Sequence, residues 1–236
     1  SMKSKRKHKF IKYLFVYVPC WFVIITLSWV LLLKYVPVYY TPLMAVRSYE
    51  YRDDSSFKTY KTWKNLEDIS INLSMAVIVA EDARFASHSG FDFVEIKNAV
   101  EDAQKGKKLR GASTISQQTA KNVFCYPSDG WIRKGFEAYF TFLIEKIWGK
   151  RRILEVYLNV AEMGKGIYGA EAAAERLFHT RANKLNKIQG AAIAACLPNP
   201  IKRKANAPTK YLSGRISNIV KEVYRTPVPD FLREEK

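Results

Sequence analysis

Ala80-Glu81-Asp82-Ala83-Arg84-Phe85-Ala86-Ser87-His88-Ser89-Gly90 follows an apolar run, Met75-Ala76-Val77-Ile78-Val79, that is typical of a buried helix. Two adjacent carboxylates, Glu81 and Asp82, therefore stand where a buried helix is expected to end. Partial burial raises the pKa of a carboxylate, and this suits it to proton transfer near neutral pH. The segment also fits a plain helix end, with both carboxylates in water and Gly90 in a turn. The remainder of the chain decides between these two interpretations.

The composition points to an anionic partner. Of 236 residues, 39 are Lys or Arg and 22 are Asp or Glu, which gives a formal net charge of +17. Such an excess favours nucleic acid, an anionic membrane surface or a phosphorylated substrate. The three cysteines, Cys20, Cys125 and Cys196, have neither metal-ligand spacing nor the pattern of a disulfide framework. We expect Cys125 and Cys196 to be small buried hydrophobic residues.

An uncharged run near the N-terminus predicts a membrane anchor. Residues 3–12 carry six Lys or Arg and no acid, and Tyr13 to Leu33 carry no charge. Because about 20 apolar residues span a bilayer as a helix, we expect a transmembrane helix over residues 13–36. A cleaved signal peptide and a buried core helix are the alternatives, but residues 36–40 offer no small-residue cleavage site. The basic residues 1–12 predict a cytoplasmic N-terminus with the rest outside, which argues against nucleic acid as a partner.

The rest of the chain predicts a mainly α-helical domain. Residues 37–62 resemble a membrane-proximal connector, residues 63–226 have helical periodicity, and residues 227–236 are expected to form a frayed C-terminal tail. Several helix boundaries have local signals. Ser113 or Thr114 can cap a helix that contains Gln117, Gln118, Lys121 and Asn122, and Asn186 with Gln189 resembles a capping box. The basic residues 105–110 are expected to form an exposed loop.

Two clusters of polar residues are candidates for a site. Gln118 and Asn122 share one helix face with Lys121 beside them, and such a polar but mostly uncharged face favours a cleft that binds sugar or phosphate. Arg133 and Glu137 are also four residues apart, on a strongly apolar helix expected over residues 131–148. Taken alone, this second pair is better explained as a structural ion pair on a half-buried helix.

The chain resembles the peptidoglycan glycosyltransferases of glycosyltransferase family 51, in particular the monofunctional, membrane-anchored biosynthetic transglycosylases. The matching blocks occur in the family's order and cover about residues 65–205. They are Glu81–Gly90, Gly111–Asn122, Arg133–Glu137, Arg152–Asn159 with Gly164 and Gly169, and Leu197–Pro200. The resemblance implies a mainly α, lysozyme-like, two-lobed glycosyltransferase domain behind a single N-terminal transmembrane helix. We expect no transpeptidase domain.

The resemblance also implies a reaction and roles for the matching residues. Lipid II would be polymerised into β-1,4-linked glycan with inversion at MurNAc C1 and release of undecaprenyl diphosphate. Glu81 would be the general base, and Glu137 the family's second glutamate. Substrate oxygens would contact Ser113, Thr114, Gln117, Gln118, Lys121, Asn122, Arg133 and Lys134. Supporting roles fall to Asp82, Phe85, His88, Gly90, Glu155 and Asn159.

Further expectations concern partners and departures from the family pattern. We expect no tightly bound cofactor and no metal site; a divalent cation, Mg²⁺ or Mn²⁺, would arrive with the substrate diphosphate. The partners are lipid II, the growing glycan strand and the bilayer of the bacterial inner membrane, with other cell-wall synthases or division proteins as further candidates. Asp129 stands where several relatives carry a basic residue, so the family's diphosphate contact at this position is not carried over to this chain. A lysozyme-like lytic glycosidase and a non-catalytic lipid II-binding scaffold are the alternative functions.

Overall fold

The computed structural model describes residues 12–107 and 111–233 and divides the chain into two units, one ending at Val36 and one beginning at Pro37. The first unit is helical: a π-helix, η1 (Tyr13–Tyr17), continues into α2 (Val18–Tyr35). Together these 23 residues form a helix long and apolar enough to cross a membrane. The expected cytoplasmic segment, residues 1–12, lies outside the described residues except for Lys12.

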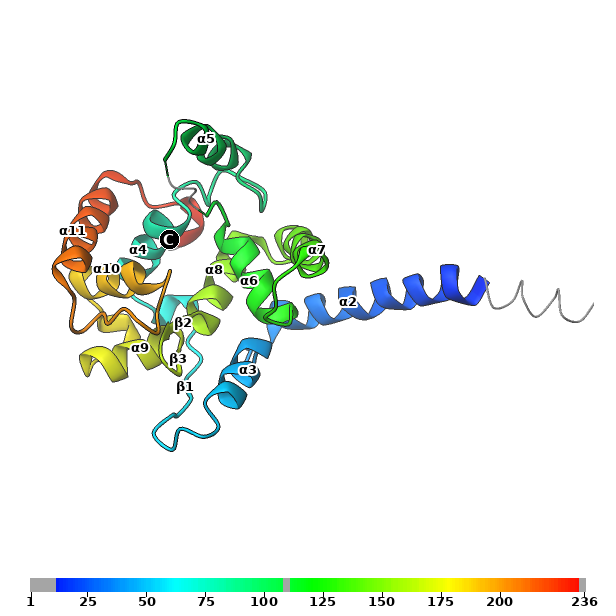
Figure 1. Ribbon diagram of the computed structural model, residues 1–236, viewed down its shortest axis with the longest axis horizontal. Helices are drawn as coiled ribbons and strands as arrows, with labels where there is room; N and C mark the ends of the chain where they lie inside the picture. The colour runs from blue at the N-terminus through cyan, green and yellow to red at the C-terminus, as the bar shows by residue number, and fades with distance from the viewer. Residues whose placement is uncertain (1–11, 108–110, 234–236) are drawn as a thin grey trace, which may run out of the picture. The chain divides into compact units, whose positions relative to one another are not determined.

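The second unit is mainly α-helical, as the sequence predicts (Figure 1). Its helices are α3 (Pro42–Glu50), α4 (Ile71–Glu81), α5 (Phe93–Gln104), α6 (Ile115–Phe124), α7 (Trp131–Ile147), α8 (Gly149–Val160), α9 (Gly169–Phe178), α10 (Lys187–Cys196) and α11 (Lys210–Arg225). The described part of this unit also contains the short 3₁₀ turns η2 (Leu66–Asp68), η3 (Ala182–Lys184) and η4 (Asp230–Leu232). The strands are β1 (Tyr60–Lys61), β2 (Glu162–Gly164) and β3 (Ile167–Tyr168).

The helices pack in two groups. α4 packs against α10 and α11, and α6 packs against α7 and α8, with α8 lying between the groups (Figure 1). Residues 73–78 of α4 are all buried, and Gly190 brings α10 so close that a Cβ there would lie 2.9 Å from the Asn72 carbonyl oxygen. Glu81 is therefore the last residue of a helix that is rigidly held in the core. This arrangement is consistent with the expected lysozyme-like fold.

Residues 37–62 belong to the second unit rather than to a separate connector. β1 pairs in parallel with β3, which pairs antiparallel with β2. Arg47 of α3 donates a hydrogen bond to Glu162 of β2 at 3.2 Å. The folded unit therefore includes the residues that the sequence analysis assigned to a connector, and α3 comes to lie beside the candidate site.

Local capping signals placed the starts of α6 and α10 correctly. Thr114 and Gln117 form a capping box at the start of α6, and Asn186 and Gln189 form one at the start of α10. The described part of the expected frayed tail differs from the prediction, because η4 packs against the domain. Phe231 of η4 contacts the ring of Phe85 edge to face. Residues 108–110 of the expected basic loop lie outside the described residues, as do residues 234–236.

Candidate active site

The centre of the site is a chain of hydrogen bonds from Tyr157 through Gln118 to Glu81. The Tyr157 hydroxyl donates to Oε1 of Gln118 at 3.1 Å, and Nε2 of Gln118 donates to Oε2 of Glu81 at 3.0 Å. Tyr157, on α8, is only 1% exposed, so its hydroxyl has a fixed position. Because that hydroxyl occupies the carbonyl end of the amide, the amino end of Gln118 must face Glu81. Gln118 thus orients one carboxylate oxygen and leaves Oε1 to react.

The surroundings of Glu81 suit a general base. Burial raises the pKa of its carboxyl above the ordinary value, and the neighbouring Asp82 contributes in the same direction. The hydrogen bond from Gln118 and the positive charges of Arg215 and Arg203 lower the pKa and so oppose this effect. Desolvation is the largest cause, and the net shift is upward. A carboxylate with a raised pKa is a stronger base near neutral pH.

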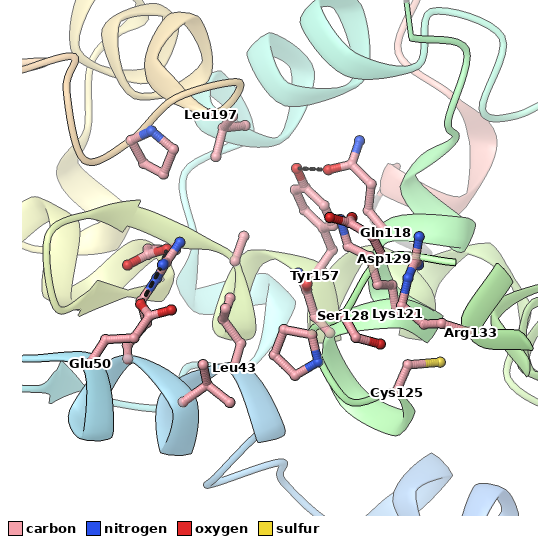
Figure 2. A pocket seen from close by; sticks show the side chains of 17 residues that line it. Leu43, Glu50, Gln118, Lys121, Cys125, Ser128, Asp129, Arg133, Tyr157 and Leu197 are labelled. Carbon is pink, nitrogen blue, oxygen red and sulfur yellow. Dashed lines mark hydrogen bonds and ion pairs between the residues drawn. The ribbon is translucent and has the colours of Figure 1, made fainter. Parts of the chain in front are cut away.

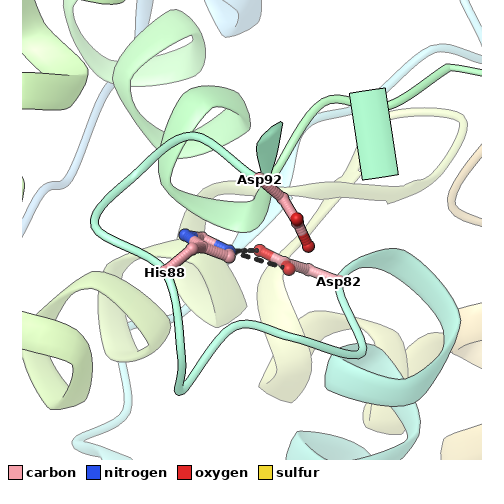
Figure 3. Close-up of side chains that lie close together, drawn as sticks. All are labelled: Asp82, His88 and Asp92. Atoms are coloured by element: carbon pink, nitrogen blue, oxygen red, sulfur yellow. Dashed lines mark hydrogen bonds and ion pairs between the residues drawn. The ribbon is translucent and has the colours of Figure 1, made fainter. Parts of the chain in front are cut away.

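Asp82 and His88 hold the loop that follows Glu81. Both oxygens of Asp82 lie 2.9 Å from Nε2 of His88, and Oδ2 also accepts the backbone N–H of Ile115 at 2.9 Å (Figure 3). Nδ1 of His88 accepts the N–H of Gly90 at 3.0 Å, so the proton of a neutral imidazole resides on Nε2. Asp82 therefore ties the end of α4 to the first turn of α6, which brings Glu81 and Gln118 together.

Gly90 closes this loop in a conformation that favours glycine. Its φ is +101°, and an added Cβ would lie 2.9 Å from Cγ2 of Thr141. The Gly90 carbonyl accepts a hydrogen bond from Oγ1 of Thr114 at 2.6 Å. Thr114 and Gln117 are both buried, and their side chains are used by the cap of α6. Of the polar residues predicted at this helix, Gln118, Lys121 and Asn122 line one cavity, and Ser113, Thr114 and Gln118 line another.

A second cluster lies on α7. Glu137 is 2% exposed and binds Arg133 and Lys134, each at 2.5 Å, which confirms the predicted Arg133–Glu137 pair. Nε of Arg133 is buried and has no hydrogen-bond partner among the described residues. Desolvation lowers the pKa of Lys121; Glu137 raises it, and the cations Arg133 and Lys134 lower it. Three cations around one carboxylate leave a net positive cluster with an unused N–H donor.

Two cavities meet at Gln118. The first, which we call the cation cavity, has a volume of about 560 Å³ and is lined by Gln118, Lys121 and Arg133 on one side and by α3 on the other (Figure 2). Exposed Asp129 also lines it. The second, the base cavity, has a volume of about 590 Å³ and is lined by Glu81, Gln118, Ser113 and other residues. The first cavity is also lined by Glu50 and Glu162, so its cations Lys121 and Arg133 lie on the side toward Gln118. Gln118 therefore lies between a proton acceptor and these two cations.

Asp82, His88 and Asp92 form a group whose potential ligand atoms lie within 4.8 Å of one another. Both ring nitrogens of His88 are already used, by Asp82 and by Gly90. Asp92 caps α5 by accepting the N–H groups of Val94 and Glu95, and it also pairs with Arg84. A cation at Nε2 of His88 would have to displace a proton and break the bond to Asp82. These residues fit a structural network better than a metal site.

The remaining predicted residues lie around this centre. Glu155 accepts the N–H of Leu66 at 2.8 Å, and Asn159 binds both the N–H and the carbonyl of Lys64, so the two fix the segment before α4. Tyr157 and Arg215 were missed. Tyr157 looked like an ordinary core position of an amphipathic helix, and Arg215 like one basic residue among several on α11. Only the packing of α8 and α11 against α4 and α6 brings them to Glu81.

Comparison with known proteins shows the family of the chain. A family model described as Transglycosylase matches residues 50–224. A biosynthetic peptidoglycan transglycosylase of Bacteroides thetaiotaomicron is 53% identical over 203 residues, which are 86% of this chain and 82% of the relative. One of the same description from Bdellovibrio bacteriovorus is 48% identical over 203 residues, 86% of this chain and 81% of the relative.

The helical fold and the family match together place the protein among the enzymes that transfer glycosyl groups. The chain belongs to the transglycosylase family and is a peptidoglycan glycosyltransferase. The expected family is confirmed. The roles of the individual residues stay predictions.

Proposed function

We propose that the protein polymerises lipid II into β-1,4-linked glycan with inversion at MurNAc C1, using Glu81 as general base. One observation carries this proposal: Gln118 places Glu81 on one side and the cations Lys121 and Arg133 on the other. An inverting displacement needs this separation, because the nucleophile is activated on the face opposite the leaving group.

The base cavity would receive the acceptor sugar. Oε1 of Glu81 takes the proton of the GlcNAc 4-hydroxyl while the hydroxyl oxygen attacks C1 of MurNAc. The bond from C1 to the diphosphate oxygen breaks with its electron pair, and the α-linkage becomes β. The raised pKa of Glu81 supports this role, since a base works best when its pKa is near the pH of the reaction.

The cation cavity would receive the diphosphate. Lys121, Arg133 and Lys134 neutralise the charge that develops on the leaving oxygen, and the unpartnered Nε of Arg133 can donate to a phosphate oxygen. Glu137 keeps Arg133 and Lys134 in place. A diphosphate leaves without a proton, so Glu137 need not act as an acid. A Mg²⁺ or Mn²⁺ ion, where the reaction uses one, would bind the diphosphate itself.

The apolar helix Tyr13–Tyr35 would anchor the enzyme in the inner membrane, with the N-terminus cytoplasmic and the catalytic unit on the outer face. Six basic residues precede the helix, and the positive-inside rule gives this orientation. A substrate confined to the same bilayer reaches the site at a high effective concentration.

Polymerisation of purified lipid II, with the glycan chains separated on a gel, tests the proposal. Wild type should make polymer, Glu81→Gln should lose about a hundredfold or more in rate, and Glu137→Gln should lose less. Release of soluble sugars from finished glycan, without consumption of lipid II, would instead indicate a lytic glycosidase. Equal rates for wild type and Glu81→Gln would remove Glu81 from the mechanism.

A further inference from the structure

We propose that residues 226–233, which we call the tail segment, form part of the active-site scaffold and that Phe231 is a positioning residue for the loop over residues 82–90. Phe231 acts through Phe85, and the effect on turnover rests on the proposed role of Glu81. The tail segment follows the residues matched by the family model, which end at 224.

The contact between Phe231 and Phe85 is specific in its geometry. The ring centroids lie 5.7 Å apart and the ring planes meet at 87°, which is the edge-to-face arrangement that aromatic pairs prefer. Phe85 is fully buried, and the ammonium of Lys150 lies 4.5 Å from its ring centroid. Phe85 thus packs between α8 and the tail segment.

Phe85 is directly connected to the groups that orient the catalytic base. Its N–H donates to the Asp82 carbonyl at 2.9 Å, and its ring lies edge-on to that of His88 at 6.2 Å. Asp82 in turn holds His88 and the N–H of Ile115. A shift of Phe85 would therefore move the joint between α4 and α6, where Glu81 meets Gln118.

A second attachment fixes the tail segment to α8. Nη1 of Arg151 donates to the carbonyl oxygen of Phe231 at 3.2 Å, and Nη2 pairs with Glu67 at 3.3 Å. The same helix carries Tyr157, which orients Gln118. α8 therefore contacts the tail segment, the loop and the amide of Gln118, and it fixes their positions relative to one another.

The tail segment does not fill space in the hydrophobic core. A cavity of about 950 Å³ lies between it and the start of α4, lined by Leu66, Ile69, Ile71 and Ser74 on one side and by residues 230–233 on the other. Residues 230–233 border this space and make their close contacts with Phe85 and Arg151. The main role of the tail segment is to contact the active-site loop rather than to cover apolar surface.

Steady-state polymerisation of lipid II by the full chain in lipid vesicles provides the first test. Phe231→Ala should lower kcat about five- to tenfold, with KM within about twofold, because the base is misplaced but the substrate contacts remain. The acid limb of the pH–rate profile should move to higher pH, since a displaced joint weakens the hydrogen bond from Gln118 that lowers the pKa of Glu81. Phe231→Tyr keeps the ring and should stay within twofold of wild type.

Asp230→Ala is the matched control, because Asp230 is exposed and pairs with Arg233 and not with the loop. It should leave kcat and the pH profile unchanged. Turnover by Phe231→Ala within twofold of wild type, or an equal loss in Asp230→Ala, would overturn the proposal. A loss of rate with an unmoved acid limb, proportional to a loss of folded protein, would also overturn it by indicating plain destabilisation.

Hydrogen exchange separates this proposal from the proposed function. The amides of Phe85 and Gly90 both donate within the loop, to Asp82 and to His88. Phe231→Ala should speed exchange in residues 82–90, and Asp230→Ala should not. If wild type makes no polymer, the proposed function fails, but faster exchange in the loop of Phe231→Ala still supports the positioning role of Phe231. Unchanged exchange in the loop of Phe231→Ala refutes that role.

Discussion

Replacing Gln118 by leucine removes the hydrogen bond that orients Glu81 while keeping a side chain of similar volume. The lost bond, at 3.0 Å, joins an amide donor to a carboxylate, and hydrogen bonds to charged groups contribute roughly 1.5–3 kcal/mol. If most of this energy is used to hold the base, kcat/KM should fall roughly 10- to 150-fold, since each 1.36 kcal/mol is a factor of ten. The effect is large because it acts on the reacting carboxylate.

The pH–rate profile of Gln118→Leu should shift in a definite direction. Gln118 stabilises the charged form of Glu81 and so lowers its pKa. Without that bond the pKa rises further, the base stays protonated to higher pH, and the acid limb of the pH–rate profile should move upward. Rates of lipid II polymerisation measured between about pH 5 and pH 9 would reveal both changes.

Two comparisons make the test strict. Asn122→Leu changes the same helix one turn later, where the side chain lines the cation cavity and does not bind Glu81; KM should change and the acid limb should not. Tyr157→Phe should slow the enzyme by itself but have no further effect in the Gln118→Leu background, because Tyr157 acts through the amide. A fall of less than about threefold in Gln118→Leu, with an unmoved acid limb, would refute the orienting role.

Three further predictions concern other parts of the site. Glu81→Gln should raise the melting temperature. The pKa of Glu81 is higher in the folded state than in the unfolded state, so ionisation of Glu81 lowers the stability of the fold as pH rises between these two pKa values. Above that range the variant, which stays neutral, should be more stable than wild type. An unchanged melting temperature at pH 8 would contradict this. Asp129→Asn should lower KM for lipid II about two- to fivefold at low ionic strength, and the gain should vanish in high salt, because one exposed negative charge is removed from the wall of the cation cavity. Gly90→Ala should destabilise the fold by about 2–4 kcal/mol in a denaturant titration, from the positive φ and the contact with Thr141; a loss under 0.5 kcal/mol would show that the loop relaxes freely.

The helices were predictable because their signals are local. Thr114 and Gln117 mark the start of α6 with side chains three residues apart, and Asn186 and Gln189 do the same for α10. Glu81 was predictable as a candidate because a carboxylate after a buried apolar run is unusual in itself. These inferences needed only neighbouring residues.

The links between distant residues were not predictable from periodicity. Gln118 lies 37 positions after Glu81, and Tyr157 lies 39 positions after Gln118, so their contact depends on how three helices pack. The role of Gln117 was also hidden, because a cap and a substrate contact call for the same side chain. Phe231 gave no signal at all, since one aromatic residue in a short polar tail has no pattern to be read.

α3 gives the cation cavity a wall with consequences for inhibitor design. Leu43, Val46, Arg47 and Glu50 line this side of the cavity, and Arg47 pairs with Glu50 at 2.7 Å. A compound confined to the opposite side would meet Lys121 and Arg133. One that extended across to α3 would meet apolar side chains and an ion pair that carries no net charge. The two walls of the cavity thus favour different ligand ends, an anionic end beside Lys121 and Arg133 and an apolar or zwitterionic end beside α3.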